Sequence, residues 1–182
     1  YVGIPFCPSV CSYCSFSSGP LDRWKEKVDA YVDALCKELE FIAEHSKNKK
    51  LNTIYIGGGT PTTLTAEQLE RLMGWIDEKF SREHLLEYTV EAGRPDSITE
   101  EKLKVIKSHG ITRISITPQS MQQKTLDTIG RKHTVEQVCE AFHMARNLGF
   151  DNINMDIIAG LPGETPADME DTLRQIALLG PD

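Results

Sequence analysis

Three of the chain's five cysteines, Cys7, Cys11 and Cys14, follow one another with the spacing C-x3-C-x2-C. Thiolates hold iron–sulfur clusters, and a short loop can place three of them around one face of a [4Fe–4S] cube. The fourth iron would then lack a protein ligand and could coordinate a substrate or cofactor. The alternative is a zinc site completed by a distant Cys or His. Cys36 and Cys139 lie in apolar helical patterns, where a buried free thiol is the commoner state, so the loop predicts an iron–sulfur cluster.

A glycine-rich run and three polar residues lie in or just after other segments whose sequence predicts a strand. The run 57–61 (GGGTP) would let a ligand approach the backbone and would expose amides and carbonyls for hydrogen bonding. Glu91, Gln119 and Asp156 stand in or just after three later stretches. A charged residue on an apolar strand costs burial energy unless it serves a partner. Ligand contact is therefore the favoured interpretation for all three, and a structural hydrogen bond is the alternative.

Two further polar residues, Arg131 and His133, lie in a predicted loop between helices. A guanidinium pairs bidentately with a carboxylate, so Arg131 suits the carboxylate of an anionic cofactor. An ordinary polar loop is the alternative interpretation for Arg131 and the favoured one for His133.

The elements that must position these residues alternate along the chain. Apolar, β-branched strand patterns lie at 2–5, 53–56, 88–91, 113–116 and 153–158. Amphipathic helical patterns lie at 28–42, 69–80, 103–106, 135–148 and 169–176. Capping boxes at 65–68 and 134–137, a Thr-Pro start at 165–166 and glycines 110, 149 and 180 mark helix ends.

Five βα units imply an α/β fold with parallel strands joined by helical crossovers. Such a sheet is either doubly wound and open or an arc of a (β/α) barrel. Five strands do not close a barrel, and a last strand without a neighbour would leave an unpaired edge. We therefore expect a sixth strand beside the last one, and the strand patterns leave both topologies open.

Composition narrows the class of protein. The formal charge is −7, with 40% hydrophobic and 26% charged residues, and no apolar run is long enough to span a bilayer. The only basic run, 47–50, is expected to be a solvated loop, so neither nucleic acid nor a membrane is an expected partner. An odd number of cysteines fits a reducing cytoplasm better than a disulfide framework. The chain begins with Tyr1 rather than Met, which suggests a piece of a longer protein.

Together these motifs resemble the radical S-adenosylmethionine superfamily, whose signature is C-x3-C-x2-C, over essentially the whole chain. More narrowly, segments 1–7 (YVGIPFC), 55–62 (YIGGGTPT) and 156–163 (DIIAGLPG) resemble the oxygen-independent coproporphyrinogen III oxidases, also called coproporphyrinogen dehydrogenases. Segment 90–97 (VEAGRPDS) resembles a variant branch of that family. The resemblance implies an α/β fold, a partial (β/α) barrel of the radical S-adenosylmethionine type with five βα units of an expected six. It also implies one core domain over 1–182, without the C-terminal region that would contact substrate.

The resemblance also implies roles for individual residues. Cys7, Cys11 and Cys14 would bind a [4Fe–4S] cluster, and the amino and carboxylate groups of S-adenosylmethionine would chelate its open iron. The residues implied to hold one or two molecules of this cofactor are Tyr1, Gly58 and Glu91 for the first, and Tyr13, Gly59, Thr60, Gln119, Arg131 and Asp156 for the second. Tyr13 replaces the usual phenylalanine, and the motif 130–133 (GRKH) is shared with haem-trafficking relatives.

The implied reaction is oxidative decarboxylation of coproporphyrinogen III to protoporphyrinogen IX in haem biosynthesis. One electron from the cluster would cleave S-adenosylmethionine to a 5′-deoxyadenosyl radical, which would take hydrogen from a propionate of the tetrapyrrole. Partners would be that substrate and a flavodoxin- or ferredoxin-like electron donor, and Arg94 is a candidate to bind substrate carboxylates. No catalytic residue is assigned. A haem-binding chaperone and a radical methyltransferase acting on a tetrapyrrole are the alternatives.

Overall fold

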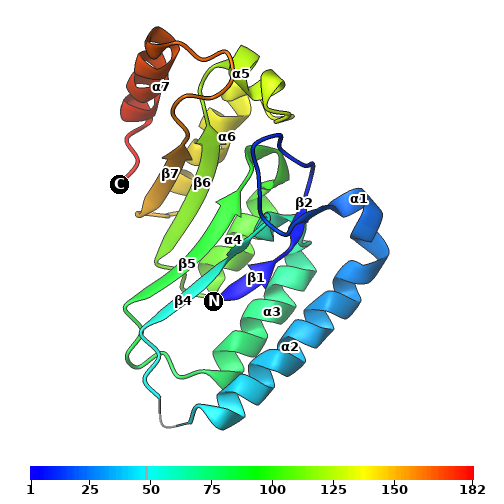
Figure 1. The fold of residues 1–182 in the computed structure, drawn as a ribbon. Coiled ribbons are helices and arrows are strands. Elements are labelled where there is room, and N and C mark those ends of the chain that lie inside the picture. The colour runs from blue at the N-terminus through cyan, green and yellow to red at the C-terminus, as the bar shows by residue number, and fades with distance from the viewer. Residues whose placement is uncertain (48) are drawn as a thin grey trace.

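Five parallel strands form one sheet in the computed structural model, which describes residues 1–47 and 49–182 (Figure 1). Their bounds are β1 (Val2–Ile4), β4 (Thr53–Gly58), β5 (Glu87–Gly93), β6 (Arg113–Gln119) and β7 (Ile153–Ile157). All five predicted strand patterns are thereby confirmed, with ends that agree to within three residues. Asn48, inside the predicted basic loop, lies outside the described residues.

The five predicted helices are also present. They are α2 (Val28–His45), α3 (Ala66–Lys79), α4 (Glu100–Ser108), α6 (Val135–Asn147) and α7 (Pro166–Leu179). Both predicted capping boxes form, and the three predicted cap glycines have positive φ angles between 69° and 81°. Short elements that the sequence pattern did not predict are β2 (Phe6–Cys7), β3 (Gly19–Pro20), α1 (Leu21–Trp24), α5 (Gln123–Thr128) and three 3₁₀ turns.

The order of the strands distinguishes the two expected topologies. It runs β1-β4-β5-β6-β7, so each crossover moves one place in the same direction, whereas a doubly wound sheet reverses at a switch point. Because such crossovers are right-handed, the helices gather on one face of the sheet, and α2, α3, α4 and α6 each pack against the next (Figure 1). The sheet is therefore an arc of a (β/α) barrel.

The two faces of the sheet differ in polarity. Alternate residues such as Ile56, Val90 and Ile114 are fully buried against the helices. The residues between them point to the opposite face, where Tyr55 and Glu91 stay partly exposed. Strands of a parallel sheet covered on both faces are nearly all apolar. The polar alternation here therefore marks an open face that is available to a ligand. In the described ranges no helix is long and apolar enough to span a membrane.

Candidate cofactor-binding site

The cysteine loop, residues 7–14, continues from β1 and is fastened to loops that follow later strands. The Gly59 and Thr60 amides donate to the carbonyls of Ile4 and Phe6, each at 2.7 Å. On its other side, the Ser12 amide donates to Ile129 O at 3.1 Å. These bonds place the cysteine loop at the carboxyl edge of the sheet, where ligands of parallel α/β folds bind.

The three loop thiols differ in their surroundings. Cys11 is buried, and its Sγ lies 3.9 Å from Arg94 Nη1, whereas the Thr60 hydroxyl donates to Cys7 Sγ at 3.5 Å. Cys14 is partly exposed. Nowhere in the described chain do three or more His, Cys, Asp or Glu side chains converge closely enough to hold a metal. The case for a cluster therefore rests on the chemistry of three thiols that are close in the sequence, two of which have polar donors at their sulfurs. These residues fit a [4Fe–4S] group.

The remaining cysteines lie away from this loop, on α2 and α6. Burial raises the pKa of the Cys36 and Cys139 thiols, so they stay protonated and are poor metal ligands. Both are free thiols, as the sequence predicted.

The glycine turn at 57–60 works differently from the sequence expectation. The amides of Gly58, Gly59 and Thr60 do not face open space. Those of Gly59 and Thr60 donate to carbonyls of β1 and β2, and the Gly58 amide donates to Glu91 Oε2 at 3.2 Å. A Cβ on Gly59 would lie 2.7 Å from Phe6 O and 2.9 Å from Cys7 Sγ. The absence of a side chain thus lets the turn approach the cysteine loop closely. The prediction that the amides of this turn are free to bind a ligand is wrong for Gly58, Gly59 and Thr60.

Glu91 lies on the open face of β5, at the start of a register shift between Glu91 and Gly93. Its Oε1 accepts a hydrogen bond from the Tyr55 hydroxyl at 2.6 Å. Burial and the Glu91 carboxylate raise the pKa of Tyr55, which keeps the phenol protonated as a donor. Tyr55 also stacks on Tyr1, with ring centroids 5.9 Å apart. Tyr55 was not predicted as a site residue. Its position on the strand next to that of Glu91 is the sequence feature that could have indicated it.

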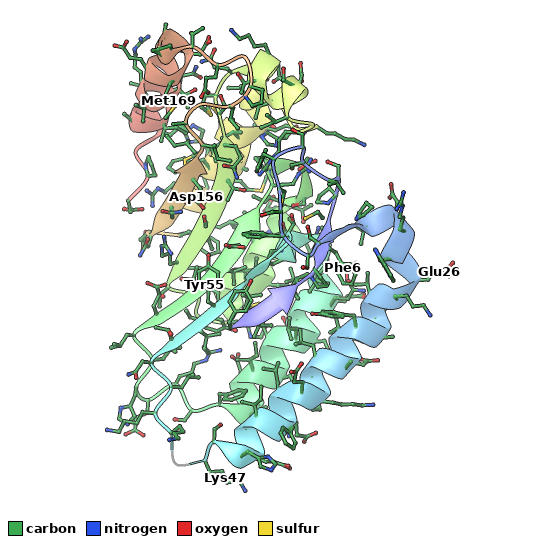
Figure 2. The ribbon with its side chains drawn as sticks, viewed as in Figure 1. Phe6, Glu26, Lys47, Tyr55, Asp156 and Met169 are labelled. Atoms are coloured by element: carbon green, nitrogen blue, oxygen red, sulfur yellow. The ribbon has the colours of Figure 1, made fainter. Side chains whose placement is uncertain are left out.

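Asp156 lies on the same open face, on β7, and its side chain is exposed. Ser115 Oγ donates to Asp156 Oδ2 at 3.0 Å, and Asn154 Nδ2 donates to Asp156 Oδ1 at 2.9 Å. Figure 2 shows Tyr55 and Asp156 on separate strands of the sheet. The carboxylate is therefore oriented by neighbours that the sequence reasoning missed, while it keeps access to solvent.

Arg131 joins the loop after α5 to the cysteine loop. Its guanidinium donates from Nη2 and Nε to the Tyr13 hydroxyl, at 2.8 and 3.3 Å, and from Nη1 to Thr117 O at 3.1 Å. His133 is fully buried nearby, and burial, with the Arg131 cation second, lowers its pKa to about 4. A phenylalanine at position 13 would lack the hydroxyl that makes this connection.

Gln119 ends β6 in a strained conformation. Its φ is 70°, in the left-handed region that residues other than glycine rarely adopt, and it lies at a shift in the β6–β7 register. Its Oε1 is buried without a partner among the described residues. An orphaned amide oxygen at a strained, bulged strand end is typical of a ligand-binding position.

Arg94 does not fit the substrate role that the sequence suggested. Only 3% of the residue is exposed, and Nε and Nη2 donate to the two carboxylate oxygens of Asp96, at 3.0 and 2.9 Å. Nη1 donates to the backbone carbonyl and the hydroxyl of Ser9, at 3.2 and 2.6 Å. Because every nitrogen is engaged within the chain, Arg94 is not available to substrate carboxylates.

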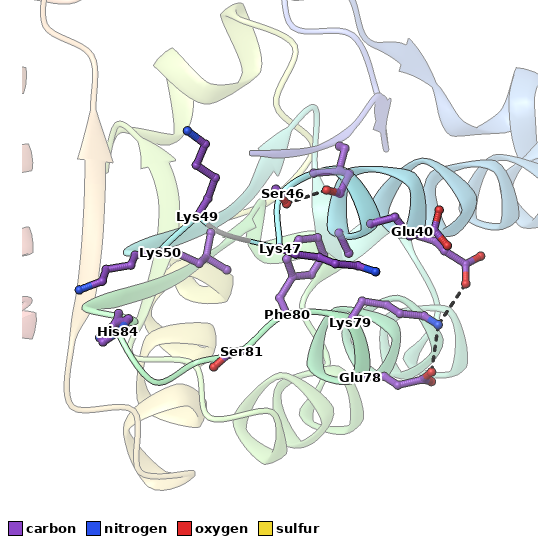
Figure 3. A pocket seen from close by; sticks show the side chains of 14 residues that line it. Glu40, Ser46, Lys47, Lys49, Lys50, Glu78, Lys79, Phe80, Ser81 and His84 are labelled. Carbon is purple, nitrogen blue, oxygen red and sulfur yellow. Dashed lines mark hydrogen bonds and ion pairs between the residues drawn. The ribbon is translucent and has the colours of Figure 1, made fainter.

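Two hollows lie at opposite ends of the sheet. One of about 280 Å³ is bordered by Tyr1, Phe16 and Gly59, beside the cysteine loop. A larger one of about 670 Å³ is lined by Lys47, Lys79 and other residues where α2 and α3 end (Figure 3). In that second hollow Lys79 pairs with Glu40 and Glu78, each at 3.1 Å. Because the larger hollow lies away from the polar strand ends, the smaller hollow is the one relevant to the site.

Comparison with known proteins identifies the family. The sequence pattern of the Radical SAM superfamily matches residues 1–176. The chain belongs to this superfamily. Radical SAM proteins use a [4Fe–4S] cluster and S-adenosylmethionine, and the cofactors predicted from the sequence are those of the family. The parallel sheet matches the radical SAM fold of the Escherichia coli protein described by its solvers as "Coproporphyrinogen III oxidase (HemN)", with a TM-score of 0.90 and 32% identity over the whole chain.

Curated radical SAM relatives carry two kinds of name. The oxygen-independent coproporphyrinogen-III oxidase-like protein HemZ of Bacillus subtilis is 45% identical over the whole chain. The heme chaperone HemW of the same organism is 39% identical over 95% of the chain. The chain spans 37% of the first relative, 45% of the second and 42% of the solved E. coli chain.

Proposed function

We propose that residues 1–182 are the core domain of a longer radical S-adenosylmethionine enzyme that decarboxylates coproporphyrinogen III oxidatively to protoporphyrinogen IX. The observation that carries the proposal is the attachment of the cysteine loop to the carboxyl edge of a sheet whose open face carries Glu91 and Asp156. The 45% identity to an oxidase-like protein and the 32% identity to an oxygen-independent coproporphyrinogen III oxidase support the choice of reaction.

Within this proposal Cys7, Cys11 and Cys14 hold the cluster. The cluster and S-adenosylmethionine, when bound, supply the radical chemistry, and the chain orients them. Residues proposed to hold the first cofactor molecule are Tyr1, Gly58 and Glu91, and those for a second molecule are Tyr13, Gly59, Thr60, Gln119, Arg131 and Asp156.

The surroundings of these residues support the assignment. Tyr55 fixes the carboxyl group of Glu91 on the open face, which suits an ammonium group of a ligand. Gln119 has a buried amide oxygen without a partner in the described chain, and Asp156 has an exposed carboxylate suited to hydroxyl donors. A flavodoxin- or ferredoxin-like protein is the proposed electron donor, and the cytoplasm is the proposed compartment.

A haem-binding chaperone is the second candidate. The 39% identity to a heme chaperone over 95% of the chain favours it, and the same scaffold would serve both activities. A radical methyltransferase acting on a tetrapyrrole is a third outcome that the same assay detects.

The test uses the full-length protein, reconstituted anaerobically with iron and sulfide. Incubation with S-adenosylmethionine, a reductant, coproporphyrinogen III and an acceptor for the electron that leaves with carbon dioxide should give a product with vinyl groups, 5′-deoxyadenosine and carbon dioxide. Tight haem binding without turnover would assign the chaperone activity instead, and a methylated product the methyltransferase activity.

Serine variants test the metal ligands separately. Replacing Cys7, Cys11 or Cys14 should abolish iron binding, whereas the matched control Cys139→Ser should retain iron and sulfide at the level of the natural sequence. If the protein with the natural sequence takes up zinc, or no metal, the proposal is overturned.

A further inference from the structure

The buried Arg94–Asp96 pair lies directly against the cysteine loop. The two residues follow β5, and the guanidinium meets the carboxylate through two parallel hydrogen bonds, which fixes its plane. Side-chain exposure is 3% for Arg94 and 18% for Asp96, so solvent screens this pair little. The remaining nitrogen, Nη1, is left to face Ser9 and Cys11.

The backbone around Arg94 is itself held in place. Ser97 Oγ donates to Arg94 O at 2.8 Å, and Lys102 Nζ on α4 donates to Ser97 O at 3.0 Å. Lys102 Nζ also donates to Thr62 O at 2.6 Å, which ties the 3₁₀ turn Pro61–Thr63 to the same group. The guanidinium is thus presented to the cysteine loop from a supported turn and not from a free surface side chain.

A fixed cation at this position has an electronic consequence for a bound cluster. Nη1 lies 3.9 Å from Cys11 Sγ and is an N–H donor to that sulfur. Hydrogen bonds to ligand sulfurs and the local charge set the reduction potentials of iron–sulfur clusters. Reduction adds one negative charge, which a nearby cation stabilises, so the potential rises.

We infer that Arg94, oriented by Asp96, is a positioning residue that holds the cysteine loop and raises the reduction potential of the cluster bound there. The inference rests on the proposed function, because it assigns the cluster to Cys7, Cys11 and Cys14. Segment 93–96 (GRPD) then makes the cluster easier to reduce.

The test is a redox titration of the full-length, reconstituted protein, followed by electron paramagnetic resonance of the reduced cluster. At the potential where half of the cluster in the natural protein is reduced, the ratio of reduced to oxidised cluster in Arg94→Gln should be about tenfold lower. This corresponds to a reduction potential lower by about 59 mV for one electron. Arg94→Lys keeps the charge but loses the planar hydrogen bonds, so its ratio should fall by less. Arg146→Gln is the matched control, because Arg146 likewise binds one carboxylate and backbone carbonyls, here those of Phe150 and Gly180, yet lies on α6.

The outcomes separate this inference from the proposed function. A natural sequence without a [4Fe–4S] cluster would overturn both. A loaded Arg94→Gln variant with an unchanged potential would overturn the inference alone. If Arg94→Gln does not fold, Arg94→Lys decides: a loaded protein with an unchanged potential overturns the inference, and a lowered potential supports it.

Discussion

The hydroxyl of Tyr55 donates to Glu91 Oε1 at 2.6 Å, across neighbouring strands β4 and β5 and 36 residues of sequence. The same carboxylate accepts from the Gly58 amide through Oε2. Glu91 is thus oriented from both sides before any ligand arrives, and pre-organisation of this kind reduces the entropy lost on binding.

Tyr55→Phe should therefore weaken binding of S-adenosylmethionine about fivefold, or by about 1 kcal/mol, by releasing the Glu91 carboxylate. Equilibrium binding to the reconstituted protein measures the effect. Tyr31→Phe is the control, because the Tyr31 hydroxyl donates instead to a backbone carbonyl, Gly3 O, at 2.6 Å. Equal affinities for Tyr55→Phe and the natural sequence would show that Glu91 needs no support from Tyr55.

Gly59→Ala should reduce iron incorporation, because the new Cβ would lie 2.7 Å from Phe6 O and 2.9 Å from Cys7 Sγ and would push the cysteine loop away. The matched control is Gly74→Ala on α3, where a Cβ meets nothing within 4 Å. That control should keep full iron content and raise the free energy of unfolding by up to about 1 kcal/mol, since alanine is the better helix former. Iron analysis and denaturant unfolding measure the two effects, and a fully loaded Gly59→Ala would contradict the packing argument.

The Tyr13–Arg131 bond should contribute to stability. Tyr13→Phe removes the acceptor of two guanidinium N–H groups, and because the ring is 36% exposed we expect a loss of about 1 kcal/mol in the free energy of unfolding. A double-mutant cycle with Arg131→Gln should show that the two losses are not additive. Additive losses would mean that the two side chains act independently.

His133 should make stability depend on pH. Its pKa is lowered to about 4 in the folded chain, so between its unfolded value and about pH 4 the unfolded state binds more protons. Stability is then fully present above the unfolded pKa and falls as the pH drops. From about pH 7.5 to about pH 5.5 the natural sequence should lose about 1 kcal/mol that His133→Gln does not lose.

Denaturant unfolding of both forms at the two pH values measures this difference. His84→Gln, at an exposed loop position, is the control and should follow the natural sequence. Parallel pH profiles for His133→Gln and the natural sequence would rule out the buried, neutral imidazole.

The sequence by itself determined the features that depend on neighbouring residues. The spacing of Cys7, Cys11 and Cys14, the alternation of strands and helices, and the capping boxes are local patterns, and local sterics and hydrogen bonding dictate them. Glu91 also stood out, because a carboxylate on an apolar strand is costly wherever that strand lies.

The tertiary structure decided the features that join distant segments. Only the strand order distinguishes a barrel arc from a doubly wound sheet, and only the packed chain shows Tyr55 beside Glu91. The sequence suggested Arg94 as a partner for substrate carboxylates, but its Nη1 is occupied by Ser9, which is 85 residues away in the sequence. Hydrogen-bond partners across such separations are chosen by how the strands and loops pack, and no local pattern in the sequence records that choice.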